Sequence, residues 1–277
     1  MAKTEVAQAK DNAPVATYDY GDAAGEGFEG TTINDLSIPF ISVLQALSPQ
    51  LEDDSIEGAK AGQLFNTVTQ RVVQQPLIVI PVLREESWVV WKPRAAGGGL
   101  VDRWEPSDQR VKAVLAKNGG SRIPPKGADG KTVPFSDGNG NDVIETHYVY
   151  CLIMDEEAEV VEGYCVIPFS STKIKVYRDW TTDLFTQKGS PPIYANRSKI
   201  STTKNQNDAG QPYYNFRIQP LTGNTRTSLI DPSTELGSAL LKEGQEFRKM
   251  IESGLARPAY DSAASSSPSA DSDDTPF

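Results

Sequence analysis

The 277-residue sequence is poor in the side chains on which most active sites depend, with two cysteines and one histidine. A four-ligand zinc site would have to recruit carboxylates at unusual spacing. A serine or cysteine nucleophile would need His147 as its base, and His147 lies in an apparent strand, where we expect a surface position near the strand end. The sequence therefore predicts a protein that is not an enzyme and that has no metal or cofactor.

Other absences narrow the class further. The sequence contains no glycine-rich motif of the P-loop or dinucleotide-binding type. It has no run of about 18 apolar residues that would predict a membrane-spanning helix, and its first residues lack the apolar stretch of a secretory signal. Cys151 and Cys165 flank a predicted hairpin, so they could be cross-strand neighbours. We expect buried free thiols and a cytoplasmic protein without membrane contacts.

The acidic charge is concentrated at the two ends of the chain. A net charge of −10 argues against nucleic-acid binding. However, residues 1–57 contain two lysines and eleven acidic residues, and residues 256–277 contain one arginine and four aspartates. The stretch from 58 to 255 is left with a net charge of +2. Acidic ends on either side of a near-neutral body are typical of tails that bind other molecules.

Composition divides the chain into three parts. Residues 1–30 are rich in Ala, Gly and acidic residues, which predicts a disordered acidic segment. Residues 256–277 are rich in Ser, Ala, Pro and Asp, which predicts a disordered acidic tail. As a flexible coil that tail would extend about 25 Å from the body. Residues 31–255 remain as the single folded domain.

Hydrophobic patterning in the folded domain predicts short strands separated by turns. A polar turn at residues 84–86 should separate the first two strands, and the acidic turn DEEA should close a hairpin. The segment YYNFRI alternates, with Tyr214, Phe216 and Ile218 on one face. The predicted strands are Leu77–Leu83, Ser87–Lys92, Tyr148–Met154, Val160–Pro168, Ile193–Thr203 and Pro212–Gln219.

Helical spacing and capping residues predict four helices. The first follows Pro39 and includes Phe40, Val43, Leu44 and Leu47. The second covers 107–117 with Ser107 as its cap, and the third, near 171–185, would direct Ile174, Tyr177, Leu184 and Phe185 to the body. The last begins with Asp231 as N-cap and Pro232, and carries the apolar stripe Leu236, Leu240, Phe247 and Ile251.

These elements do not alternate as in a parallel α/β protein. We expect an α+β or mainly β fold. An OB-like Greek-key barrel decorated with helices fits the pattern, although strand spacing alone does not separate a barrel from a sandwich.

Four segments combine aromatic and basic residues, the composition that binds single-stranded nucleic acid by base stacking and phosphate neutralisation. They are SWVVWKPR, TKIKVYRDW, YANRSKISTTK and PYYNFRI. The competing interpretation is that the tryptophans are core residues and the cations an ordinary solvated face. The predicted DNA-binding residues are Trp88, Trp91, Lys92, Arg94, Lys173, Lys175, Tyr177, Arg178, Arg197, Lys199, Lys204, Tyr213 and Arg217.

The tail ends in DSDDTPF, which combines Asp271, Asp273 and Asp274 with Pro276 and Phe277. An aromatic ring beside a carboxylate, preceded by further acids, can act as a two-part ligand: the ring fills an apolar pocket while a basic rim binds the carboxylates. The same acids can compete with nucleic acid for a basic groove, and salt should weaken this competition.

This ending resembles the acidic tip of single-stranded DNA-binding (SSB) proteins, and the blocks IPFISVLQALSPQL, GAKAGQLFNTVT, WKPRAAGGG and YYNF look like phage-encoded proteins described as single-stranded DNA-binding. The resemblance implies an OB-fold body that holds single strands, here residues 31–255. It also implies that Asp271, Asp273, Asp274, Pro276 and Phe277 recruit replication, recombination and repair enzymes.

The leading hypothesis is a sequence-nonspecific single-stranded DNA-binding protein that protects phage replication or recombination intermediates in the cytoplasm of a bacterial host. The sequence leaves open whether it forms a homo-oligomer. One alternative is a non-enzymatic interaction protein with acidic tails, such as a transcription cofactor or virion component. Another is a metal-dependent nuclease using the adjacent acids Glu156-Glu157 or Asp53-Asp54.

Overall fold

Two long strands rich in β-branched and aromatic residues form the centre of the fold. The computed structural model describes residues 27, 37–51, 56, 58–128, 130, 132–207, 210–256 and 258–259. The strands are β1 (Ile41–Val43), β2 (Leu64–Asn66), β3 (Arg71–Val73), β4 (Leu77–Trp91), β5 (Leu100–Trp104), β6 (Phe135–Ser136), β7 (Asp142–Met154), β8 (Val161–Ser170), β9 (Ser198–Gln206) and β10 (Pro212–Pro220). The α-helices are α1 (Gln109–Lys117), α2 (Lys173–Phe185) and α3 (Glu235–Glu252), and short 3-10 turns occur at Pro49–Leu51, Arg94–Ala96 and Ile193–Ala195.

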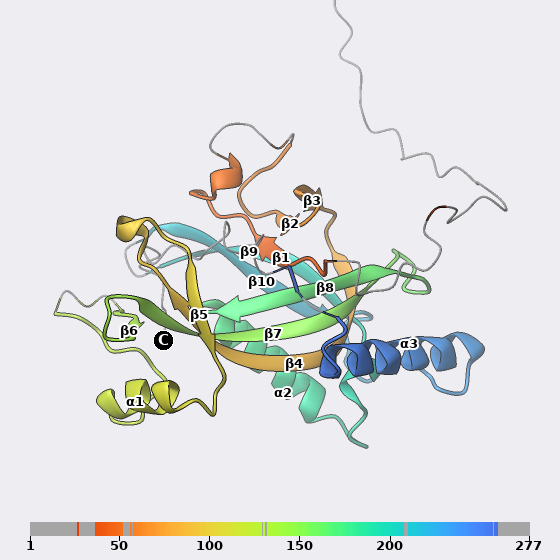
Figure 1. Cartoon of the computed structure of the whole chain (residues 1–277). Helices are drawn as coiled ribbons and strands as arrows, with labels where there is room; N and C mark the ends of the chain where they lie inside the picture. Colours follow the sequence, from red (N-terminus) through yellow and green to blue (C-terminus); the bar gives the residue numbers. More distant parts are fainter. Residues whose placement is uncertain are drawn as a thin grey trace, which may run out of the picture.

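The larger sheet is antiparallel and has the order β10-β9-β4-β7, with β8 and β6 both beside β7 and β5 beside β4. Strands β4 and β7 pair from Ile78↔Met154 to Trp91↔Asp142, with a bulge between Pro81 and Leu83. The first residues of β4 pair with β9 and its last residues pair with β5. The sheet therefore has two regions: a main region with β8, β9 and β10, and a distal region with β5 and β6 at one end of the long strands (Figure 1).

The segment 38–45 lies between the two outer strands of the main region. Val166 of β8 donates its backbone N–H to the carbonyl of Pro39 at 2.9 Å. On the other side, the amide of Gln45 bonds both the N–H and the carbonyl of Tyr214 in β10, at 2.9 and 2.8 Å. Among the described strands β8 and β10 do not pair with each other, so the ladder is not a closed barrel.

Alternation along the strands places an apolar core on each side of the sheet. One core, the α3-side core, packs Ile80 and Tyr150 against Phe247 of α3. The other, the α2-side core, packs Val79 and Cys151 against α2. A smaller α1-side core fills the distal region. Its members are Trp88, Val90, Trp104, Val111, Val114, Phe135 and Val143.

In Figure 1, α1 and α3 lie near opposite ends of β4 and β7, and α2 lies along the sheet between them. The expectation of a fold that mixes strands and helices is confirmed, and the strands of both sheets are antiparallel. The hairpin of β7 and β8, the β9–β10 pair and the three later helices are present as predicted. Within the described ranges, no helix is both long and apolar enough to cross a membrane.

The predicted helix after Pro39 is wrong. Ile41–Val43 forms β1, and Phe40 makes a parallel bridge with Val166. Successive side chains go to opposite cores, with Phe40 in the α3-side core and Ile41 in the α2-side core. This alternation requires extended chain, whereas the spacing of Phe40 and Leu44 also fits a helix.

The predicted turn at residues 84–86 is also wrong, because β4 continues through it. Each polar side chain there has a partner: Arg84 donates to the hydroxyl of Tyr177 at 3.0 Å, and Glu85 accepts from Tyr150 at 2.6 Å. Tertiary contacts therefore stabilise a polar stretch inside a strand.

Two capping predictions shift by a few residues. The N-cap of α1 is Asp108, whose carboxylate accepts from the N–H of Arg110. The N-cap of α3 is Thr234, which accepts from the N–H of Gly237 at 2.9 Å, while Asp231 closes the preceding turn through Ser233.

The cysteine prediction is confirmed. Cys151 and Cys165 lie directly opposite each other on β7 and β8 as buried free thiols.

Candidate nucleic-acid interface

The β9–β10 hairpin lies in a basic part of the chain. Between residues 187 and 230 the sequence has six basic residues and one acidic residue. In the register of the pair, Ile200 faces Ile218 and Thr202 faces Phe216, on the side of the α2-side core. The intervening residues therefore project from the opposite face of the hairpin.

Three predicted DNA-binding residues lie on this second face. Lys199 is opposite Gln219, Arg217 is opposite Ser201, and Tyr213 is opposite Asn205. Arg217 is exposed, and Lys199 and Tyr213 are half-buried. We call Lys199, Arg217 and Tyr213 the hairpin face. Lys204 is exposed near the tip of the same hairpin, opposite Tyr214.

Arg197 directly precedes β9, and its guanidinium is engaged in hydrogen bonds to the backbone. Its Nε donates to the carbonyl of Ser228 at 3.2 Å and its Nη2 to the carbonyl of Leu229 at 3.3 Å. Burial lowers the pKa of its guanidinium. These contacts tie β9 to the segment before α3, so Arg197 is not part of the hairpin face.

The predicted residues on α2 separate into two groups. Lys175 and Arg178 are exposed, whereas Tyr177 is buried and stacks on His147 with ring centroids 4.2 Å apart. The Lys173 ammonium lies 6.0 Å from the ring centroid of Phe216, and burial lowers its pKa to about 8. Tyr177 is therefore a core residue, and the half-buried side chain of Lys173 points toward Phe216.

The predicted residues at the end of β4 and just after it lie far from the hairpin. Trp88 is fully buried in the α1-side core, 5.7 Å from Phe135 between ring centroids, and so is not accessible for base stacking. Trp91 is half-buried and Lys92 is exposed. The side chain of Arg94 lies outside the described part of the structure.

Distance along β4 separates these residues from the hairpin. β9 pairs with β4 only as far as Val79. Trp91 is therefore about 40 Å further along the strand, at roughly 3.3 Å per residue. The structure gathers Lys199, Lys204, Tyr213 and Arg217 on one hairpin and does not bring the β4 residues to them.

A polar cluster that the sequence analysis missed lies on the sheet between α1 and α2. His147 is buried within β7, contrary to the expected surface position, and its Nε2 donates to Glu145 Oε1 at 2.9 Å. Arg122, from the loop after α1, forms ion pairs with Glu86 and with Glu145. We call Glu86, Glu145 and His147 the carboxylate–histidine cluster.

Charge pairing favours the ionised form of the Glu145 carboxyl group. Burial alone would raise the pKa of Glu145, but the hydrogen bond from His147 and the charge of Arg122 outweigh burial and lower it. One signal for this cluster is visible in the sequence, since Glu145 and His147 are two residues apart in a strand and so share a face. Nothing local in the sequence indicated that Arg122 would reach them.

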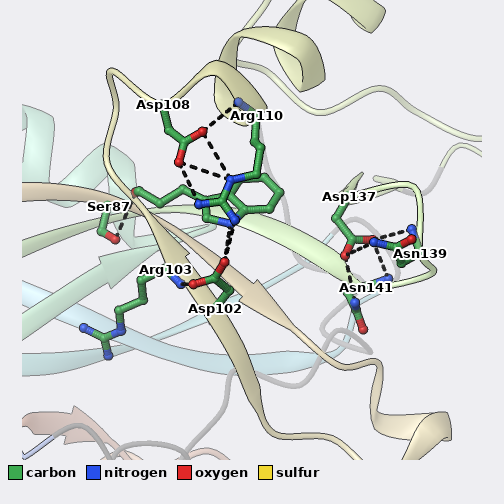
Figure 2. Close-up of polar contacts among 9 residues, drawn as sticks. Ser87, Asp102, Arg103, Asp108, Arg110, Asp137, Asn139 and Asn141 are labelled. Atoms are coloured by element: carbon green, nitrogen blue, oxygen red, sulfur yellow. Dashed lines mark hydrogen bonds and ion pairs between the residues drawn. The ribbon is translucent and has the colours of Figure 1, made fainter.

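A pocket of about 320 Å³ lies in the distal region beside α1. Figure 2 shows Arg110 between Asp108 and Asp102, with ion pairs of 2.7 and 2.6 Å. The guanidinium lies 4.7 Å from the ring centroid of Trp104. The indole N–H of Trp104 and the backbone N–H of Arg103 lower the pKa of Asp102, with a further contribution from Arg110.

The opposite wall of this pocket is a turn organised by Asp137 (Figure 2). Its carboxylate accepts from the N–H of Asn139 at 2.7 Å and from the side-chain amide of Asn141 at 2.8 Å. Because Arg110 is neutralised by two aspartates, it offers little net attraction to a phosphate. We interpret this pocket as a structural polar network and not as part of a nucleic-acid interface.

The predicted partner-binding residues Asp271, Asp273, Asp274, Pro276 and Phe277 lie outside the described residues, as do the two predicted disordered segments apart from Gly27, Ala256, Pro258 and Ala259. Their role stays a prediction.

Comparison with known proteins gives one match. A family model described as Pam3 phage gp34-like protein matches residues 7–255. The searches of curated proteins and of solved structures each return no match. Because the family model covers most of the chain, the protein belongs to the Pam3 phage gp34-like family and is a phage protein.

Proposed function

We propose that this protein binds single-stranded DNA without sequence preference and that the hairpin face is the centre of its interface. The observation that carries the proposal is the charge of the hairpin. Lys199 and Arg217 lie on the same face of two paired strands, and Lys204 lies near the hairpin tip on the other face, within a stretch that contains one acidic residue. Cations spaced along a strand pair can neutralise successive phosphates, and release of counterions then drives binding.

Tyr213 adds the second part of such an interface. It lies on the same face as Arg217, four residues away along β10. An aromatic ring beside cations lets a base stack while its phosphate is neutralised, and stacking is tolerant of sequence. The protein in this proposal acts by binding and not by catalysis.

The order of the strands supports the proposal at the level of the fold. β4 pairs with β7 and β9, β7 pairs with β8, β9 pairs with β10, and α2 lies between β8 and β9 in the chain. We propose that these five strands follow the order of an OB fold, a partly open Greek-key barrel that often holds oligonucleotides. Because a fold alone does not determine a function, the hairpin face carries the argument.

The proposed interface differs from the usual site of an OB fold, which lies on the second and third strands and the adjoining loops. The corresponding strands here are β7 and β8. Their outward side chains Tyr150 and Val166 are 2% and 0% exposed beneath α3 and Phe40. α3 and Phe40 do not cover β9 and β10 in this way. We therefore place the nucleic acid along β9 and β10.

We further propose that residues 271–277 recruit replication and recombination enzymes in the cytoplasm of an infected bacterium. This part rests on the resemblance of DSDDTPF to the SSB tip, and the acidic residues would also compete with DNA for the hairpin face.

Binding of fluorescently labelled oligo-dT, followed by anisotropy, tests the proposal. Tryptophan quenching is a poor readout, because Trp88, Trp104 and Trp180 are at most 6% exposed. The test variant is Lys199→Glu with Arg217→Glu. If each cation contacts one phosphate, the slope of log affinity against log salt should become shallower by about 1.4, at roughly 0.7 per contact for single strands.

The matched control is Lys242→Glu on α3, a lysine whose side chain is 75% exposed. We expect this variant to bind like the wild type. Equal affinities for the double variant and the control would reject the hairpin face, and absence of binding by the wild type at low salt would reject DNA binding itself.

A further inference from the structure

We propose that the carboxylate–histidine cluster binds a divalent first-row metal ion, such as Zn²⁺ or Mn²⁺, in competition with Arg122. One donor atom from each of Glu86, Glu145 and His147 lies within 4.8 Å of the other two. Imidazole nitrogen and carboxylate oxygen together suit such ions. This inference is independent of the proposed DNA binding.

The backbone fixes the three donors on one face of the sheet. Glu86 on β4 lies directly opposite His147 on β7, and Glu145 precedes His147 by two residues. The imidazole plane is held by Tyr177, which stacks at 4.2 Å with an angle of 13° between the rings. Metal–ligand distances near 2.0–2.2 Å require the carboxylate of Glu86 to move inward slightly, and its side chain is 24% exposed, which leaves room for this.

A second observation supports cation binding at this cluster. The Oε2 atom of Glu145 is buried and has no hydrogen-bond partner among the described residues, and this side chain is 4% exposed. A buried carboxylate oxygen without a donor is costly, and such atoms call for a specific explanation. A metal ion bound at this carboxylate supplies one.

Arg122 is the cation that now neutralises the cluster. It pairs with Glu86 and with Glu145, and its guanidinium lies 5.7 Å from the ring centroid of Trp88. Its side chain is 41% exposed, and it belongs to a loop, whereas the three proposed ligands belong to strands. Arg122 can therefore leave the cluster while the ligands stay in place.

Arg122 and the metal ion use the same oxygens, so they should exclude each other. Arg84 and Arg178 are further positive charges near the cluster, since Arg84 bonds Tyr177 and Arg178 acts on the carboxyl of Glu145. They weaken the attraction for any added cation. Removal of the charge of Arg122 should consequently strengthen metal binding, which a purely structural ion pair does not predict.

The test is calorimetric titration of Zn²⁺ and of Mn²⁺ into the full chain after treatment with a chelator. We expect the wild type to bind one ion, and Arg122→Gln to bind it at least about tenfold more tightly, because one competing charge at contact distance is gone. Adding Glu86→Gln or His147→Gln to Arg122→Gln should abolish this binding.

The matched control is Arg110→Gln. It removes an arginine that also pairs with two carboxylates, Asp102 and Asp108, but has no histidine beside it. We expect no gain of metal binding in this variant. Melting temperature with and without metal gives a second readout if Arg122→Gln is less stable, since metal should then raise its melting temperature more than that of the wild type.

Three results would overturn the proposal. They are absence of binding by both the wild type and Arg122→Gln at millimolar metal, equal affinities of these two proteins, and binding that survives the loss of Glu86 or His147. Each would leave the cluster as an ion-pair network that anchors the loop after α1.

Discussion

At the scale of single residues, Lys173 has a charge that the fold opposes. Burial lowers the pKa of its ammonium from 10.5 to about 8. Between pH 8 and 10.5 the unfolded chain therefore binds more protons at this site than the folded chain, so the free energy of unfolding rises with pH in this window. Below pH 8 the cost of burying the charge is fully present.

Lys173→Met should accordingly increase the free energy of unfolding at neutral pH. The advantage over the wild type should shrink as pH rises from 8 to 10.5, as urea denaturation at several pH values can measure. A pH-independent difference would show that the ammonium is solvated. Oligo-dT binding should be unchanged, because this side chain faces Phe216 and not the hairpin face.

Gly62 packs closely against Tyr214 of the β9–β10 hairpin. Its backbone has φ +92°, and a Cβ atom there would lie 2.5 Å from the Tyr214 ring. Gly62→Ala combines a left-handed conformation with overpacking, so we expect a loss of about 2–4 kcal/mol in the free energy of unfolding. Gly98→Ala is the control, since Gly98 has φ +66° and open space around it. It should cost about 1 kcal/mol.

Sequence reasoning at this scale identified which side chains share a face but not what covers them. The paired thiols of Cys151 and Cys165 were predictable because both strands of their hairpin were recognisable. The alternation of side chains around Trp88 was recognised in the sequence. However, Trp88 is buried by residues of α1 and β6, which are distant from it in the sequence. His147 was misplaced for the same reason, because Tyr177 and Arg122 come from other elements.

At the scale of secondary-structure elements, the helices differ in how fully their apolar stripes are used. On α3 the ring of Phe247 is 0% exposed and lies 4.5 Å from the ring of Tyr164. On α2 the sequence predicted that Phe185 packs on the body, but its side chain is 85% exposed. Trp180 occupies the core position instead and donates to Ser198 at 3.1 Å.

The buried face of α3 and the exposed position on α2 predict very different costs for replacing phenylalanine by alanine. Phe247→Ala should lower the free energy of unfolding by about 3–5 kcal/mol because it leaves a cavity beneath α3. Phe185→Ala should change it by less than about 0.5 kcal/mol. Thermal and urea unfolding of the two variants measure both values, and similar losses for both would contradict the assigned helix faces.

Element boundaries were less predictable than element types. The hairpins and later helices follow from periodicity and caps, but β4 runs through Arg84 and Glu85 because Tyr177 and Tyr150 satisfy these side chains. Phe40 and Leu44 have helical spacing, yet Phe40 pairs with β8. In each case contacts between residues distant in sequence outweigh the local pattern. A local pattern contains no information about such contacts.

At the scale of the whole molecule, charge is distributed unevenly between the body and the acidic ends. The basic stretch from 187 to 230 stands against an overall charge of −10. The sequence predicted the acidic ends, the near-neutral body and a fold of strands and helices. It did not predict that α3 and Phe40 would cover β7 and β8, which shifts the proposed interface to the hairpin face.

Deletion of residues 271–277 separates two roles of the tail. It removes three aspartates, so we expect tighter oligo-dT binding at low salt, with the difference vanishing at high salt as charges are screened. Phe277→Ala keeps the aspartates and should leave DNA binding unchanged while both variants lose partner recruitment. Weaker DNA binding after the deletion would contradict competition by the tail.

The central claim is that this phage protein holds single-stranded DNA by its phosphates, and one titration tests it most directly. The full chain is titrated into labelled oligo-dT, and into a duplex of matched length, at several salt concentrations. We predict tighter binding to the single strand and a linear fall of log affinity with log salt. Absence of binding at low salt, or equal affinity for the duplex, would contradict the account.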